Sequence, residues 1–195
     1  MITSEIKNIL GIIATVLVFI GYIPYIKDIV SKKTKPHVYS WFVWSFLTLI
    51  VFFLQLKDGA GSAAFVTLAA GLCCVSVTLL GIYYKNKIEI TKMDNVFLVL
   101  SLISLVLWLV AEQPLYSAIL ATSVDIFAFA PTVRKSWNDP YSETLSFYFL
   151  NSLRFALAVL ALQKYSVISA IYPISWLIAN GLFAMFLLVR RNKIK

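Results

Sequence analysis

Charged residues are scarce in this sequence: Asp, Glu, Lys and Arg make up 13% of it, about half the share of an ordinary soluble domain. Hydrophobic residues make up 61%. A helix that crosses a bilayer needs about 20 mostly apolar residues. Seven such runs can be drawn, at 6–26, 38–56, 62–84, 96–111, 115–133, 145–162 and 167–189. They leave no room for a soluble domain, and we therefore predict an all-α, multi-pass membrane protein with seven transmembrane helices.

The residues that build most active sites are also few. The one histidine, His37, lies in a polar loop, and the two cysteines, Cys73 and Cys74, are adjacent inside an apolar run. Adjacent cysteines suit neither a simple disulfide nor a zinc site, and no set of nucleophile, base and orienting group is visible. A retinal photoreceptor needs a lysine within its last helix, and the run 167–189 has none. We predict no enzyme activity, no metal and no cofactor.

Acidic residues are fewer than basic ones, at 9 against 17. The predicted helices place thirteen basic residues on one side of the membrane and three on the other. The larger group is Lys27, Lys32, Lys33, Lys35, Lys85, Lys87, Lys92, Arg134, Lys135, Arg190, Arg191, Lys193 and Lys195, and the smaller is Lys7, Lys57 and Lys164. This asymmetry predicts an extracytoplasmic N-terminus and a cytoplasmic C-terminus. The basic excess then reflects topology and contact with anionic lipids of the cytoplasmic leaflet, and it requires no nucleic-acid partner.

One outline occurs twice in the chain, because residues 21–45 align with residues 128–152 at a constant offset. The matches include Pro24 with Pro131, Lys27 with Arg134, and Ser45 with Ser152. Two copies of one unit are typical of duplicated membrane transporters. Since a proline removes a backbone donor and bends a helix, we predict that Pro24 and Pro131 act as paired hinges, each near the inner end of its helix. The first helix is expected to end around Pro24.

The run 96–111 has no counterpart in either copy. A single span inserted between two three-helix units gives both units the same orientation, so we predict a linker helix here. The expected arrangement is 3+1+3. It comprises a first three-helix bundle in residues 1–92, the linker helix in 93–112, and a second three-helix bundle in 113–195.

The second unit carries the polar residues that lie deepest in the predicted helices. Asp125, Arg154 and Asn180 all fall roughly 13–17 Å from the inner boundary at 1.5 Å per residue. A charge at this depth costs about 2.5–3.5 kcal/mol on insertion scales. We therefore expect Asp125 and Arg154 to face each other, as a salt bridge or through water. The pair either lines a substrate cavity or only orients two helices.

Helical spacing places further residues beside these charges. The predicted substrate-binding residues are Asp125, Asn151, Arg154, Trp176 and Asn180. Tyr148 and Trp44 are the predicted gate or aromatic wall, although Trp44 with Trp41 also fits an interfacial aromatic belt. Aromatic walls with a few polar groups are the usual composition of a small-molecule site.

These features together resemble the PQ-loop and SWEET-like (MtN3) transporter superfamily over essentially the whole chain. The resemblance rests on Pro24 and Pro131 with their basic loops, and on Asn180, where sugar-transporting relatives place an asparagine that faces the substrate. It implies alternating access around a site in the middle of the membrane. The glutamine of the PQ dipeptide is replaced by Tyr25 and Thr132, so a sugar substrate does not follow.

The chemistry of the two charges favours a zwitterion, because Arg154 suits a carboxylate or phosphate and Asp125 an amine or a proton. We predict a transporter of small polar or zwitterionic solutes. The alternative is a non-transporting receptor or peptide-binding protein on the same fold, in which Arg154 captures a peptide carboxylate. Two units in one chain suffice for a monomeric pathway, and composition leaves a homo-oligomer open as well.

Overall fold

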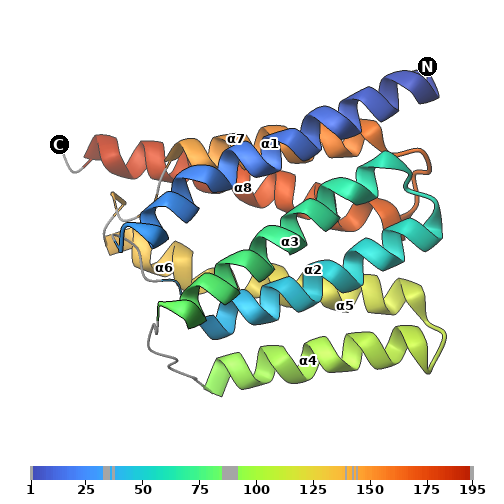
Figure 1. Cartoon of the computed structure of the whole chain (residues 1–195), viewed down its shortest axis with the longest axis horizontal. Helices are drawn as coiled ribbons and strands as arrows, with labels where there is room; N and C mark the ends of the chain where they lie inside the picture. Colours follow the sequence, from blue (N-terminus) through green and yellow to red (C-terminus); the bar gives the residue numbers. More distant parts are fainter. Residues whose placement is uncertain are drawn as a thin grey trace.

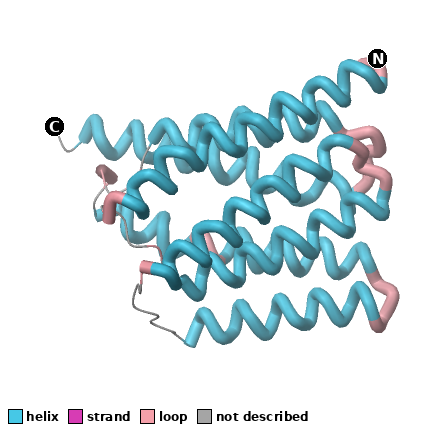
Figure 2. The backbone as a smooth tube through the Cα atoms, in the orientation of Figure 1, coloured by secondary structure: helices cyan, strands magenta, loops and turns pink. Residues whose placement is uncertain are grey.

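The computed structural model describes residues 2–32, 36, 38–84, 92–138, 140–141, 143 and 145–193, except for the side chains of Asp94, Pro131, Arg134, Lys135 and Asn138. This part of the chain is helical, and Figure 2 shows no strand in it. The helices are α1 (Ser4–Val30), α2 (Val38–Asp58), α3 (Ser62–Tyr83), α4 (Lys92–Leu109), α5 (Pro114–Phe127), α6 (Ala130–Asn138), α7 (Leu145–Ala161) and α8 (Val167–Lys193).

Helix length and composition mark the chain as a membrane protein. Four helices, α1, α2, α3 and α8, are long and apolar enough to cross a bilayer, and the apolar stretches of α4, α5 and α7 are shorter. The outward faces carry large hydrophobic side chains, such as Ile12 and Phe19 on α1 and Val99 on α4. Such faces suit lipid, because lipid tails are as apolar as the side chains themselves. The prediction of an all-α membrane protein is confirmed.

The helices pack side by side with their long axes roughly aligned (Figure 1). Helix α3 packs against α1 and α2, and α8 packs against α5 and α7. The remaining main contacts join α1 to α7 and α2 to α5, while α4 packs against α5 and α2. The N-terminus and the C-terminus lie at opposite ends of this bundle (Figure 1).

The prediction that the first helix ends around Pro24 is wrong. Helix α1 continues through Pro24 to Val30, with Pro24 inside it. A proline removes one backbone hydrogen bond, and membrane helices tolerate this loss where their neighbours accommodate the freed carbonyl. Tight packing of α1 against α3 and α7 supports the continuous helix here.

The fifth predicted helix, by contrast, is interrupted. Helix α5 ends at Phe127 and α6 begins at Ala130, with a turn in which the Phe129 amide donates to the Ile126 carbonyl (3.1 Å). Pro131 is the second residue of α6, and a proline suits the first turn of a helix because its missing N–H has no partner there in any case. The two matched prolines therefore have different effects on their helices.

Candidate functional site

Asp125 lies in the last turn of α5, just before the break, and its side chain is buried (2% exposed). One carboxylate oxygen, Oδ2, accepts a hydrogen bond from Trp176 Nε1 on α8 (2.8 Å). The Tyr172 hydroxyl also approaches this carboxylate, while the other oxygen, Oδ1, is buried and has no hydrogen-bond partner among the described residues. Buried polar atoms are nearly always paired, so this oxygen makes Asp125 a candidate binding residue.

Arg154 on α7 is the second buried charge (5% exposed). Its Nε donates to Asn151 Oδ1 one turn earlier (2.5 Å), and its guanidinium lies 4.2 Å from the centre of the Phe155 ring. The Nη1 atom is buried and lacks a partner within the described part of the chain. Arg154 is thus fixed in position while one donor group stays unused.

The expected direct salt bridge between Asp125 and Arg154 is not formed. Each side chain bonds to a different neighbour, and α8 lies between the helices that carry them. Aromatic rings connect the two charges, because the Phe155 ring beneath Arg154 stacks on the Trp176 ring at 6.4 Å and 13°. The direct pair is absent because similar depth along two helices does not determine which helix packs between them.

Two of the predicted site residues therefore contact the charges directly: Trp176 bonds to Asp125, and Asn151 bonds to Arg154. Asn180 is buried one turn beyond Trp176, and its amide donates to the Trp176 carbonyl (2.7 Å). Tyr148 packs against Phe129 and Phe183, at 5.9 and 4.5 Å between ring centres. Its hydroxyl donates to the Glu143 carboxylate (2.8 Å).

Trp44 lies on α2 and is partly buried. Its indole Nε1 is buried and has no partner among the described residues, and its ring meets that of Trp41 edge to face at 5.3 Å. One turn further on, Thr48 donates to the Trp44 carbonyl (2.7 Å) and shares a hydrogen bond with the Tyr172 hydroxyl on α8 (3.4 Å). Thr48, and not the Trp44 side chain, therefore makes the contact between α2 and Tyr172.

Sequence reasoning missed Tyr172, which lies near both charged side chains. Its hydroxyl lies within electrostatic range of both Asp125 and Arg154. Helical spacing could have identified it, because one face of α8 carries a polar or aromatic residue at every fourth position: Tyr172, Trp176 and Asn180. We refer to Asp125, Asn151, Arg154, Tyr172 and Trp176 as the central site.

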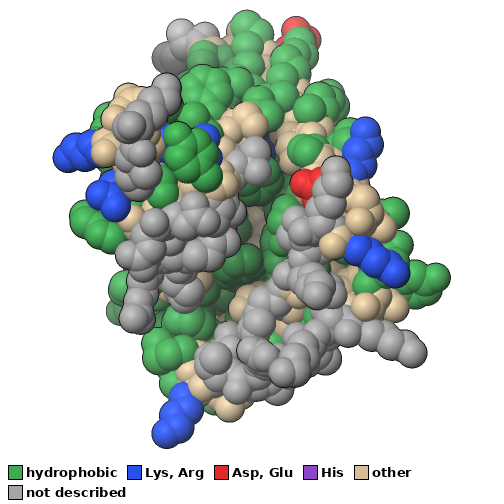
Figure 3. Space-filling model, turned by 90° about the vertical axis from the view of Figure 1, so that its left-hand side faces the viewer, with side chains coloured by type: hydrophobic (Ala, Val, Ile, Leu, Met, Phe, Trp, Pro, Cys, Tyr) green, Lys and Arg blue, Asp and Glu red, His purple; other side chains and the backbone are tan. Residues whose placement is uncertain are grey.

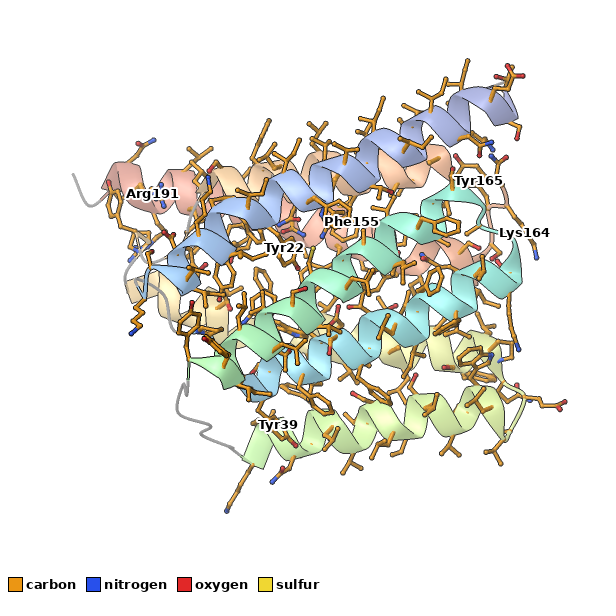
Figure 4. The ribbon with its side chains drawn as sticks, viewed as in Figure 1. Tyr22, Tyr39, Phe155, Lys164, Tyr165 and Arg191 are labelled. Carbon is orange, nitrogen blue, oxygen red and sulfur yellow. The ribbon has the colours of Figure 1, made fainter. Side chains whose placement is uncertain are left out.

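Tyr22 was also missed. It points from α1 into the interior of the bundle (Figure 4), where its hydroxyl lies 3.5 Å from Cys74 Sγ on α3. Arg154 lies within electrostatic range of Tyr22 and of both cysteine thiols. Both cysteines are buried, as packing residues are. Cys74 also makes a polar contact with the Tyr22 hydroxyl.

A second polar cluster lies at the end of the bundle that carries the N-terminus, near Lys164 (Figure 4). There the Asp58 carboxylate accepts hydrogen bonds from Lys164 Nζ (2.8 Å), Ser169 Oγ (2.6 Å) and the Ser166 hydroxyl. Gln55 accepts from Thr67 (2.7 Å) and donates to the Ser169 carbonyl (3.0 Å). We refer to Gln55, Asp58, Thr67, Lys164, Ser166 and Ser169 as the Asp58 cluster.

The Asp58 cluster ties the α2–α3 end of the chain to the α7–α8 loop, and the sequence had suggested no role for it. Gln163 strengthens the same junction, because its backbone amide donates to the Ala60 carbonyl (3.1 Å) and its side chain donates to Asn8 (3.0 Å). The adjoining loop turns at Gly59 and Gly61, which have φ of +86° and +69°. Glycine adopts such angles without steric cost.

Searches of protein-family models, of curated proteins and of solved structures find no match to this chain.

Proposed function

We propose that this protein transports small polar or zwitterionic solutes across a membrane, as a PQ-loop and SWEET-like carrier. The observation that carries this proposal is the central site, where two opposite charges are buried between apolar helices. Each keeps one polar atom without a partner in the described part of the chain. A charge inside a membrane protein is costly and commonly marks a substrate or ion pathway.

The packing of the helices supports the 3+1+3 arrangement. Each three-helix unit would have its third helix in the middle, α3 between α1 and α2, and α8 between α5 and α7. The units would meet through α1 with α7 and through α2 with α5, which are equivalent contacts under a two-fold relation. Helix α4, the linker, packs against α5 and α2.

Aromatic pairs at matched positions of the two units also support the duplication. Tyr22 packs against Trp41 in the first unit, with 6.2 Å between ring centres. The equivalent positions in the second unit, Phe129 and Tyr148, pack at 5.9 Å. Conserving this contact between the copies is expected if both descend from one unit with the same helix order.

The two ends of the bundle suit alternating access in which the N-terminal end is closed. Hydrogen bonds of the Asp58 cluster join the two units there. At the other end, Arg191 bonds within its own unit, to the carbonyls of Pro140 and Glu143. Figure 3 shows this end hollowed near its centre, with hydrophobic side chains in the hollow. The basic residues favour placing this open end in the cytoplasm and the N-terminus outside.

Reconstitution into liposomes tests the proposal. Purified protein should exchange at least one zwitterionic solute in a counterflow assay, and Asp125→Asn should reduce the exchange strongly. A thermal-shift screen of amino acids, sugars, nucleosides and vitamins selects the solute, since a ligand at one hundred times its Kd stabilises by about 2.7 kcal/mol. Saturable binding without exchange would instead favour the receptor alternative.

A further inference from the structure

Two buried polar atoms of the central site define what a ligand must supply. Asp125 Oδ1 is an acceptor and Arg154 Nη1 is a donor, and neither has a hydrogen-bond partner among the described residues. The Tyr172 hydroxyl lies near both charged side chains. A matching ligand therefore carries a cationic or donor group and, separately, an anionic or acceptor group.

The charges restrict the ligand further. A neutral solute would leave both buried charges uncompensated, and an amine or a carboxylate alone would leave one. Buried charges are tolerated chiefly when they are paired. Since Asp125 and Arg154 do not neutralise each other directly, a zwitterion is the ligand class that compensates both.

The walls of the site are built largely from aromatic rings. On the second unit, Phe155 lies between the Arg154 guanidinium and the Trp176 ring, and Phe129 meets Trp176 edge to face at 5.6 Å. On the first unit, Tyr22 contacts Trp41, which contacts Trp44. The two sets of rings meet where Tyr22 lies 6.0 Å from Phe147. Edge-to-face and offset pairs of rings stabilise beyond the area that they bury, so a ligand with a ring gains more here than one without.

We propose that the solute is a zwitterion that carries an aromatic ring, of the aromatic amino acid class. Its ammonium group binds Asp125 Oδ1, its carboxylate accepts a hydrogen bond from Arg154 Nη1, and its ring packs among the aromatic side chains. This inference rests on the proposed function, because it names the substrate class of the same site.

A series of L-phenylalanine analogues on the unmodified protein tests each part of the ligand. Phenethylamine lacks the carboxylate, 3-phenylpropionate lacks the amine, L-alanine lacks the ring, and L-cyclohexylalanine has a saturated ring. L-Phenylalanine should bind at least about tenfold more tightly than each of the first three, and more tightly than L-cyclohexylalanine, by thermal shift and calorimetry. Equal affinity for L-alanine and L-phenylalanine would overturn the inference.

One variant tests whether the ammonium group of the ligand binds Asp125. Asp125→Asn should weaken L-phenylalanine and phenethylamine while leaving 3-phenylpropionate unchanged, and Asp58→Asn is the matched control that keeps the order of affinities. If Asp125→Asn does not fold, the analogue series decides alone. Counterflow of L-alanine or glucose without tighter binding of L-phenylalanine would refute the aromatic ligand and keep the transporter. Tight binding of L-phenylalanine without counterflow would keep the ligand and refute transport.

Discussion

Two hydrogen-bonded carboxylates in this protein have opposite surroundings. Asp58, at the N-terminal end, uses both oxygens, with Lys164 on Oδ1 and two serine hydroxyls on Oδ2. Asp125, between α5 and α8, uses only Oδ2, and Oδ1 has no partner among the described residues. A carboxylate with both oxygens bonded stabilises the structure that surrounds it. Under the proposed function, the unused oxygen of Asp125 is the binding group, because a hydrogen bond that the fold leaves unmade can be made by a ligand.

The same contrast holds for the cations. Lys164 is largely exposed, at 60% of its side chain, and pairs with Asp58 at 2.8 Å. Arg154 is buried, and among the described residues its hydrogen bond is to Asn151 in its own helix. The Asp58 cluster therefore fastens the end of α2 to the α7–α8 loop and the start of α8, whereas the central site leaves charged groups partly unpaired. Four predictions test this difference.

The largest effect is expected from the central charges. Asp125→Asn and Arg154→Gln should each reduce solute exchange by about 100-fold, because losing one buried, charged hydrogen-bond partner costs about 2–5 kcal/mol of binding free energy. Counterflow in liposomes measures the loss. Size-exclusion chromatography of each variant controls for folding, and a well-folded variant that exchanges solute at the normal rate would show that the site is only structural.

Replacing Asp58 should mainly affect stability. Asp58→Ala removes three hydrogen bonds to a carboxylate, and we expect the free energy of unfolding to fall by about 2–3 kcal/mol. The matched variant Lys164→Gln should cost less than about 1 kcal/mol, since exposed ion pairs contribute little. Thermal unfolding in detergent measures both. Solute affinity should stay unchanged in both variants, and a loss of affinity comparable to that of Asp125→Asn would place Asp58 in the binding site.

The prolines should differ in their effect on transport. Pro131→Ala restores a backbone donor at the break between α5 and α6, close to Asp125, and should slow exchange by roughly tenfold by stiffening that hinge. Pro24→Ala should have a smaller effect, because α1 is already continuous there. Initial rates of counterflow compare the two variants. If both variants slow exchange equally, the break between α5 and α6 is not the hinge, and the two prolines act as a matched pair.

The smallest effect is the coupling between the central charges. Because Asp125 and Arg154 are separated by α8, the stability losses of Asp125→Asn and Arg154→Gln should add to within about 0.5 kcal/mol in the double variant. Denaturant or thermal unfolding of all four proteins completes this cycle. A double variant markedly more stable than the sum predicts would mean that the two charges pair directly.

Composition and hydrophobic runs were enough to predict the helical class of this protein, since a chain this apolar must satisfy its backbone within helices. They also identified the buried charges, because charges inside apolar runs are conspicuous. The internal repeat predicted which residues occupy equivalent positions, and the contact between Tyr22 and Trp41 does match that between Phe129 and Tyr148.

Only the tertiary structure decided which side chains meet. The sequence places Asp125 and Arg154 at one depth, but α8 packs between their helices and gives each a different partner, Trp176 and Asn151. Likewise, the outlines around Pro24 and Pro131 match, yet α1 continues through Pro24 while a break precedes Pro131. The Asp58 cluster joins residues more than one hundred positions apart. Local patterns determine helices and burial, whereas the order in which helices pack around one another determines every contact between them.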